Sequence, residues 1–127
     1  MIGPFLTLYM AFAGLMLGSF VNMAADRMPR GESIIRPRSH CRACNRQLNT
    51  IDLLPVLGYL IRRGRCATCR TPIGAVAPSV EGACGAFMVA PIVWLGLWPG
   101  ALLGLASVGL FGGALIVAAM RRGLARA

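Results

Sequence analysis

Residues 1–25 read MIGPFLTLYMAFAGLMLGSFVNMAA, and this stretch contains no charged side chain. A helix needs about 20 consecutive, mainly apolar residues to cross the hydrocarbon core of a bilayer, so residues 1–25 predict a transmembrane helix. A cleaved signal peptide would carry a basic residue ahead of its apolar core. The first basic residue here is Arg27, which follows the apolar stretch, so we expect a retained membrane anchor.

The composition extends this prediction to the rest of the chain. Apolar residues make up 57% of the 127 residues and charged residues make up 13%. A soluble domain averages about one half apolar and about one quarter charged residues. The surplus of apolar side chains therefore indicates that much of the chain lies in lipid.

Two further apolar blocks account for this surplus, at residues 82–98 and 100–120. Pro99 and Gly100 lie between the two blocks and form a turn signal. We therefore predict a transmembrane helical hairpin at residues 81–120, in addition to the first transmembrane helix.

Residues 26–80 differ from the apolar blocks, because they are rich in Arg, Pro and Cys. Pro55 argues against one long helix over residues 51–61. We expect a small polar domain of turns, short strands and one helical turn. A segment of this size buries little apolar surface, and such small domains usually need a metal ion or disulfide bonds.

The basic residues indicate how the chain is oriented. All thirteen are arginines, ten of them within residues 27–70 and three in a basic tail at residues 121–127. Three membrane spans place both groups on one side, and the positive-inside rule makes that side cytoplasmic. We therefore expect the N-terminus outside and the cysteine-containing domain and the C-terminus in the cytoplasm.

The same arginines bear on the partners of the protein. A net charge of +9 suits either nucleic acid or anionic lipid headgroups. Residues 26–80 contain one aromatic residue, Tyr59, and no nucleic-acid-binding motif. We therefore expect a lipid bilayer with anionic headgroups as a partner, and no nucleic acid.

Four cysteines form two Cys-x-x-Cys pairs, Cys41 with Cys44 and Cys66 with Cys69, and 21 residues separate the pairs. Four-thiolate zinc ribbons have a similar spacer of about 20 residues. Zinc that is bound by four thiolates keeps no open position, so the predicted site is structural. The predicted fold class is mainly α, with about three transmembrane helices and a small cytoplasmic zinc-ribbon-like domain between the first and the second.

Two other uses of these cysteines stay open at the level of sequence. A disulfide framework needs an oxidising compartment, whereas the predicted topology places residues 26–80 in the reducing cytoplasm. A thioredoxin-like redox pair would open a helix in an α/β fold, which the pattern lacks. We expect His40 to be exposed and Cys84, in the second apolar block, to be a small buried hydrophobe.

Several short motifs follow one another along the chain: GSFVNMAADRMPRGES at 18–33, SHCRACN at 39–45, DLLPVLGYL at 52–60, RRGRCATC at 62–69 and PSVE at 78–81. With these motifs the chain resembles the amino-terminal half of the type IV prepilin peptidases. Besides the four cysteines, the matching residues are Gly18, Ser19, Phe20, Asn22, Arg27, Pro29, Asp52, Pro55, Gly64, Arg65 and Glu81.

The resemblance implies a location, a substrate and a cofactor. Members of that family are bifunctional enzymes of the bacterial inner membrane, which cleave the leader of prepilins and then N-methylate the new terminal residue with S-adenosylmethionine. It therefore implies a prepilin-like substrate and a place in type IV pilus assembly or type II secretion.

The sequence also departs from the family pattern. The catalytic aspartates of the family, one of them in a Gly-x-Gly-Asp motif, lie in further membrane helices. The aspartates of this sequence are Asp26 and Asp52, and neither lies inside an apolar block. An aspartic protease needs two carboxylates that share a proton and activate water. We therefore expect the chain to correspond to the amino-terminal domain alone and not to be a self-sufficient aspartic endopeptidase.

Three hypotheses for the function follow. The first is N-methyl transfer, alone or beside a separate peptidase half, with Glu81, Asp52 and Asp26 as candidates to orient the substrate amine or to hold the donor. Each candidate has a structural alternative: an arginine partner for Asp26, a turn cap for Asp52 and a helix start for Glu81. The second is a non-catalytic, zinc-stapled membrane subunit that docks prepilin or complements a peptidase half. The third is a gene product that has lost its activity.

Overall fold

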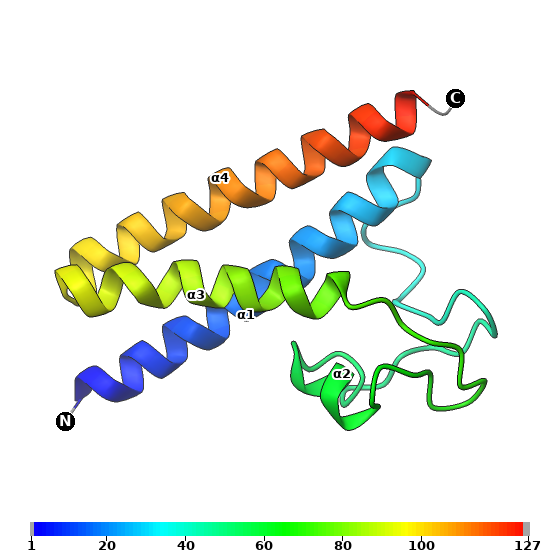
Figure 1. The fold of residues 1–127 in the computed structure, drawn as a ribbon, viewed down its shortest axis with the longest axis horizontal. Helices are drawn as coiled ribbons and strands as arrows, with labels where there is room; N and C mark the ends of the chain where they lie inside the picture. Colours follow the sequence, from blue (N-terminus) through cyan, green and yellow to red (C-terminus); the bar gives the residue numbers. More distant parts are fainter. Residues whose placement is uncertain (1, 126–127) are drawn as a thin grey trace.

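The computed structural model describes residues 2–125, and helices dominate it (Figure 1). The elements are α1 (Ile2–Arg27), the short 3₁₀ helix η1 (Met28–Arg30), α2 (Leu57–Ile61), α3 (Val76–Leu95) and α4 (Leu97–Leu124). Three helical stretches are long and apolar enough to cross a membrane, namely Gly3–Arg30, Val76–Leu95 and Leu97–Leu124. The predicted mainly α-helical fold with three candidate membrane-spanning helices is therefore confirmed.

The hairpin between α3 and α4 turns at Gly96, and the prediction of a turn at Pro99 and Gly100 was wrong. Gly96 has a φ of 86°, a conformation that glycine adopts without steric cost. Pro99 lies in the first turn of α4, where its missing N–H removes no helical hydrogen bond. Gly100 instead allows α4 to pack closely against α3, because a side chain there would meet the backbone of Ile92.

Small residues let α1 approach α3 closely. A Cβ atom at Gly14 would lie 2.8 Å from the carbonyl oxygen of Cys84, and one at Gly18 would lie 2.7 Å from Cα of Glu81. Cys84 and Met88 are fully buried between the helices, which confirms the expected role of this cysteine. Close backbone packing is how helices associate in lipid, where no hydrophobic effect drives them together.

Both arginine-rich parts of the chain lie at the same end of the helical bundle. A Cβ atom at Gly123, near the end of α4, would lie 2.8 Å from Cβ of Pro29 in η1. The segment between η1 and α3 extends from this end, and the α3–α4 hairpin with the exposed Trp94 and Trp98 forms the opposite end (Figure 1). That the arginine-rich end faces the cytoplasm stays a prediction from the positive-inside rule.

The segment between η1 and α3 consists of turns and the short helix α2. Within residues 2–125 there is no strand, only two isolated antiparallel bridges, between His40 and Gln47 and between Arg65 and Pro72. The expectation of short strands was wrong, because each bridge sits at the mouth of a tight turn and Pro72 has no N–H to extend a ladder. The expected effect of Pro55 is confirmed, since α2 begins two residues after it.

Candidate metal centre and adjoining cavity

The first cysteine pair lies on a tight turn, which we call the first knuckle (residues 39–48). The amide of Cys41 donates a hydrogen bond to the carbonyl of Arg46 (2.9 Å), and the amide of Asn45 donates to the carbonyl of Cys41 (2.8 Å). Asn45 has a φ of 54°, in the left-handed region that asparagine enters more readily than most residues. The turn therefore holds the backbone of Cys41 and Cys44 in a compact loop.

The second cysteine pair lies on a turn of the same design, the second knuckle (residues 64–73). The amide of Cys66 donates to the carbonyl of Thr71 (3.0 Å), and the amide of Arg70 donates to the carbonyl of Cys66 (3.2 Å). Arg70 has a φ of 58°. Each of these features lies 25 positions after its counterpart in the first knuckle. The chain thus builds one cysteine-bearing unit twice.

The two knuckles bring four sulfur atoms together. The Sγ atoms of Cys41, Cys44, Cys66 and Cys69 all lie within 4.8 Å of one another. Sγ of Cys41 lies 3.7 Å from that of Cys69, and Sγ of Cys44 lies 3.9 Å from that of Cys66. Four sulfurs at 2.3 Å from a tetrahedral zinc ion are about 3.8 Å apart. The cluster can therefore hold a metal ion and is compatible with structural zinc.

The chemistry of the thiols also fits a metal centre. None of the chain's cysteines, all within the described residues, forms a disulfide. Hydrogen bonds from the amides of Thr68 and Cys69 lower the pKa of Cys66 to about 6. At Cys44 the amide of Arg46 acts in the same direction, but burial and the neighbouring sulfurs outweigh it and raise the pKa to about 11. Four thiolates this close repel one another, so a bound cation is needed to keep all four deprotonated.

Asp52 is bound by arginines on two sides. Its carboxylate is 5% exposed, accepts a hydrogen bond from Nε of Arg62 at 2.6 Å and pairs with Arg46. It also accepts a hydrogen bond from the amide of Asn49 (3.2 Å), which confirms the turn cap that the sequence allowed. Burial raises the pKa of Asp52, but the hydrogen bonds from Arg62, Asn49 and Arg46 outweigh it and hold the pKa below its ordinary value. Through this ion pair, Asp52 helps to position the guanidinium group of Arg46, a residue of the first knuckle, beside the candidate metal centre.

Asp26 lies in another ion-pair group, at the end of α1. It pairs with Arg30, one helical turn later (2.8 Å), and with Arg42 of the first knuckle. Arg42 also reaches Glu32 at 3.4 Å. The arginine partner that the sequence allowed for Asp26 is thus present, and this group connects the first knuckle to the membrane helix.

Glu81 is a buried carboxylate on α3 and has a different kind of partner. Its Oε2 accepts a hydrogen bond from the amide of Val56 at 2.7 Å, and within residues 2–125 no arginine lies within ion-pair distance of it. The prediction that Glu81 anchors a helix start was wrong, because α3 begins five residues earlier, at Val76. It instead connects α3 to the segment that carries the knuckles.

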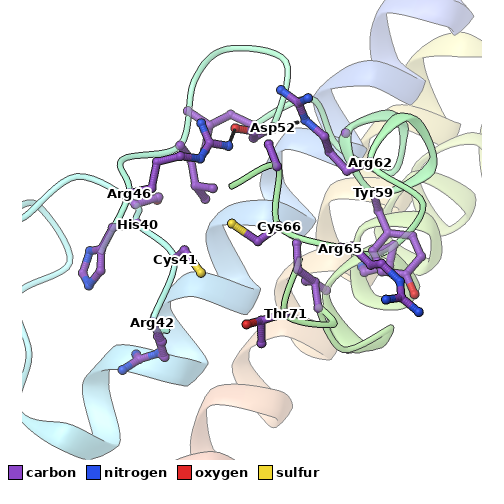
Figure 2. A pocket seen from close by; sticks show the side chains of 18 of the residues that line it. His40, Cys41, Arg42, Arg46, Asp52, Tyr59, Arg62, Arg65, Cys66 and Thr71 are labelled. Carbon is purple, nitrogen blue, oxygen red and sulfur yellow. Dashed lines mark hydrogen bonds and ion pairs between the residues drawn. The ribbon is translucent and has the colours of Figure 1, made fainter. Parts of the chain in front are cut away.

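A cavity of about 620 Å³ lies between the membrane helices and the knuckles. Ser19 and Asn22 of α1 line the cavity from one side, and Glu81 of α3 lines it from another. Asp52 and Tyr59 line it from the segment between η1 and α3 (residues 31–75), which carries the candidate metal centre and which we call the metal-binding segment. Figure 2 shows the metal-binding side of this cavity, with Cys41 and Cys66 among its lining residues. The structure therefore brings Glu81 and Asp52 together beside the metal centre.

Only some of the residues that the sequence singled out as candidate site residues line this cavity. Asp26 is not among the lining residues, and His40 lines the cavity with Nδ1 3.1 Å from the carbonyl of Arg38. Ser19 and Asn22 had no role assigned from sequence, although both belong to the matching GSFVN motif. The two residues are three positions apart on a helix and therefore lie on one face, and this spacing could have indicated that they line the same site. No sequence signal pointed to the contact between Val56 and Glu81.

Comparison with known proteins places this architecture in a family. A family model described as the bacterial peptidase A24 N-terminal domain matches residues 12–95. The prepilin leader peptidase/N-methyltransferase of Myxococcus xanthus (strain DK1622) is 39% identical over 79 residues, which is 62% of this chain and 24% of that protein. The protein of the same name from Bacillus subtilis (strain 168) is 43% identical over 68 residues, 54% of this chain and 27% of that protein.

A third relative, the prepilin leader peptidase/N-methyltransferase of Burkholderia pseudomallei (strain K96243), is 34% identical over 115 residues and covers 68% of this chain and 37% of that protein. The chain thus spans about a quarter to a little over a third of the length of these relatives. No solved structure is a significant match. Because the family model covers more than half of the chain, the protein belongs to the bacterial peptidase A24 family and contains that family's N-terminal domain.

Proposed function

We propose that this protein takes part in processing type IV prepilin-like proteins at the bacterial inner membrane, as an N-methyltransferase domain that uses S-adenosylmethionine. The names of its relatives, which combine leader peptidase and N-methyltransferase, support this proposal. The observation that carries it is the cavity at the end of the bundle. Glu81 lines this cavity as a buried carboxylate, and among residues 2–125 no arginine lies within ion-pair distance of it.

The cavity has the size and lining of a small-molecule site. Its volume of about 620 Å³ lies in the usual range of roughly 300–1,000 Å³ for such sites. The lining is mainly apolar, and Ser19, Asn22 and Tyr59 supply polar groups that would hold the methyl donor. When bound, S-adenosylmethionine supplies an electrophilic methyl group.

Glu81 is the residue that we propose to orient the substrate amine and to accept its proton. An N-terminal amine must lose a proton to act as a nucleophile. A carboxylate offers about four acceptor directions, and the amide of Val56 occupies one of them. Asp52 is engaged by two arginines, which favours Glu81 over it for this role.

The metal centre is proposed to be structural zinc. A site with four thiolates keeps no open position for substrate or water. Cys41 and Cys66 line the cavity, so the ion would fix one of its walls. The two knuckles carry few buried apolar side chains, and metal binding would supply the stability that they lack.

We further propose that this chain does not cleave the prepilin leader by itself. Aspartic proteolysis needs two carboxylates that share a proton. Asp26 and Asp52, the aspartates of the sequence, are each paired with two arginines, and only Asp52 lines the cavity. Leader cleavage would then need a pair of carboxylates that the described residues do not supply.

The second candidate function is a non-catalytic membrane subunit that docks prepilin or completes such a peptidase. The four-cysteine cluster favours this candidate, because a metal ion held by four thiolates would keep no open position for a substrate. In that case the knuckles and the cavity would bind the prepilin without transferring a methyl group.

One experiment separates the two candidates. The purified protein in lipid nanodiscs is incubated with S-adenosylmethionine labelled in the methyl group and either an intact or a leader-cleaved pilin. The proposal predicts label on the N-terminus of the cleaved pilin and no cleavage of the intact one. An unlabelled pilin, combined with leader cleavage once an aspartate-bearing peptidase half is added, would support the second candidate instead.

A further inference from the structure

Helix α2 presents a row of large apolar side chains to the outside of the protein. Leu57, Leu60 and Ile61 are 55%, 61% and 57% exposed. Their spacing of three and four residues puts them on one face of the helix. The other face is packed, since Gly58 is buried against the backbone of Asp52. A row of this kind on a polar segment marks an interaction surface.

The position of α2 along the membrane helices suggests what covers this row. The 20 residues of α3 extend about 30 Å, which is the thickness of the hydrocarbon core. Glu81 lies five residues from the start of α3, hence about 7 Å inside that helix. Because the amide of Val56, directly before α2, is bound to Glu81, the start of α2 lies level with the first turns of α3 and not beyond the end of that helix (Figure 1).

Arginines adjoin the apolar row. A groove of about 570 Å³ is lined by Ile61, Arg62, Arg63, Arg65, Cys66, Ala67 and Arg70. Arg62 is paired with Asp52. In the described part of the chain no carboxylate lies within ion-pair distance of Arg63, Arg65 or Arg70. Guanidinium groups without a carboxylate partner are well suited to bind phosphate with two parallel hydrogen bonds.

We propose that α2 and this groove form an interfacial anchor for anionic phospholipid. Leu57, Leu60 and Ile61 enter the boundary between headgroups and acyl chains, and the guanidinium groups of Arg63, Arg65 and Arg70 bind the headgroup phosphates. An apolar face with flanking basic residues is the usual composition of elements that lie in this boundary. Since Tyr59 of the same helix lines the large cavity, the bilayer fixes one wall of that cavity.

The depth of α2 is tested with a single tryptophan in an otherwise tryptophan-free protein (Trp94→Phe, Trp98→Phe). Leu60→Trp places the reporter on the apolar row, and Ile35→Trp places it in the loop before the first knuckle, where the side chain is 79% exposed. Both proteins are reconstituted in bilayers of phosphatidylcholine brominated on its acyl chains. We expect strong quenching of Leu60→Trp and little of Ile35→Trp.

Equal quenching at both positions would contradict the proposal. A blue-shifted emission of Leu60→Trp, which reports apolar surroundings, would also contradict the proposal if the bromine atoms did not quench it. In that case a second copy or another protein segment would cover α2. If Leu60→Trp does not fold, hydrogen exchange of the unmodified protein replaces it. The amides of residues 57–61 should then exchange more slowly in bilayers than in detergent, and equal rates would overturn the depth assignment.

The headgroup contacts are tested by charge removal. Nanodiscs that contain equal amounts of phosphatidylglycerol and phosphatidylcholine are used, and the lipids that remain bound to the protein are identified by native mass spectrometry. Each arginine near an anionic surface contributes about a fivefold preference, so Arg63→Gln/Arg70→Gln should lower the enrichment of phosphatidylglycerol more than tenfold. The matched control is Arg36→Gln/Arg38→Gln, in an exposed loop. Equal enrichment in the two double variants would overturn the headgroup assignment.

Discussion

Glu81 connects the membrane bundle to the metal-binding segment through one backbone group. The residue that it holds, Val56, has a φ of 59°, which β-branched residues rarely adopt. The amide of Leu57 donates to the carbonyl of Pro55 at 2.5 Å, so that Val56 is the centre of a γ-turn, a strained conformation. The hydrogen bond from Val56 to Glu81 stabilises this turn and thereby the position of α2.

Replacing Glu81 by alanine should destabilise the protein. The partly buried amide of Val56 would lose its acceptor, which costs about 1–3 kcal/mol of the free energy of unfolding. Glu81→Gln retains an acceptor oxygen and should cost less. Both free energies can be measured by denaturant titration in detergent, with the exchange rate of the Val56 amide as a local probe. Equal losses of unfolding free energy in the two variants would show that the hydrogen bond to Val56 does not account for the stabilising effect of Glu81.

Asp52 should give the stability a defined pH dependence. Burial raises its pKa, but Arg62, Asn49 and Arg46 outweigh burial and hold the pKa below its ordinary value. The contribution of this carboxylate is therefore present above its unfolded pKa of about 3.9 and is lost as the pH falls through the lower folded pKa. Compared with the wild type, Asp52→Asn should be less stable at pH 7 and should lose less stability on acidification, which thermal melts at a series of pH values can measure. Parallel acid profiles would contradict this assignment.

At the scale of single elements, we expect the two knuckles to form one stable unit only when their sulfurs share an ion. Neither knuckle has a regular strand or helix, and each is closed by a few backbone hydrogen bonds. Cys66 is the one buried ligand of the four, and the others are partly or fully exposed. The metal-binding segment should therefore be the part of the protein most sensitive to loss of the ion.

Metal analysis of purified protein should find one zinc ion per chain. Cys66→Ser should lose the ion, whereas Cys84→Ala, in the buried contact between the helices, should keep it. A strong chelator should unfold residues 39–73 and leave the membrane helices intact, because α1, α3 and α4 pack without the ion. Hydrogen exchange resolves the two regions. A metal-free protein with slow exchange in both knuckles would refute a metal-dependent fold.

The packing of the membrane helices depends on particular glycines. A Cβ atom at Gly18 would lie 2.7 Å from the backbone of Glu81, whereas one at Gly109 would meet nothing within 4 Å. Gly18→Ala should therefore destabilise the bundle by about 1–3 kcal/mol through overpacking. Gly109→Ala should be neutral or stabilising by up to about 1 kcal/mol, because alanine has the higher helix propensity. Unfolding in detergent compares them, and equal effects would argue against a close α1–α3 contact.

At the scale of the whole molecule, the features that the sequence predicted correctly are those with a local signal. Uninterrupted apolar stretches predict three membrane-spanning helices, and the spacing of Cys41, Cys44, Cys66 and Cys69 predicts a four-sulfur cluster. Both signals depend on neighbouring residues or on a spacing that many proteins share. They do not require knowledge of how distant segments pack.

Other features depend on contacts between distant segments and could not be predicted. The hydrogen bond between Val56 and Glu81 joins residues that are 25 positions apart, on elements with no shared pattern. The turn at Gly96 was missed because Pro99 and Gly100 carry the stronger local signal, although both are compatible with the first turn of a helix. The cavity exists only where α1, α3 and the knuckles meet, so no single motif encodes it.

The central proposal is that Glu81 acts on the substrate amine in this cavity, and one rate comparison tests it most directly. The transfer of labelled methyl groups to a leader-cleaved pilin is measured for the wild type, for Glu81→Gln and for Asp26→Asn. Loss of a general base lowers a rate by about 10²- to 10⁴-fold, so Glu81→Gln should fall by at least a hundredfold while Asp26→Asn, outside the cavity, stays within about twofold of the wild type. Equal rates for Glu81→Gln and the wild type, with unchanged metal content, would contradict the proposal.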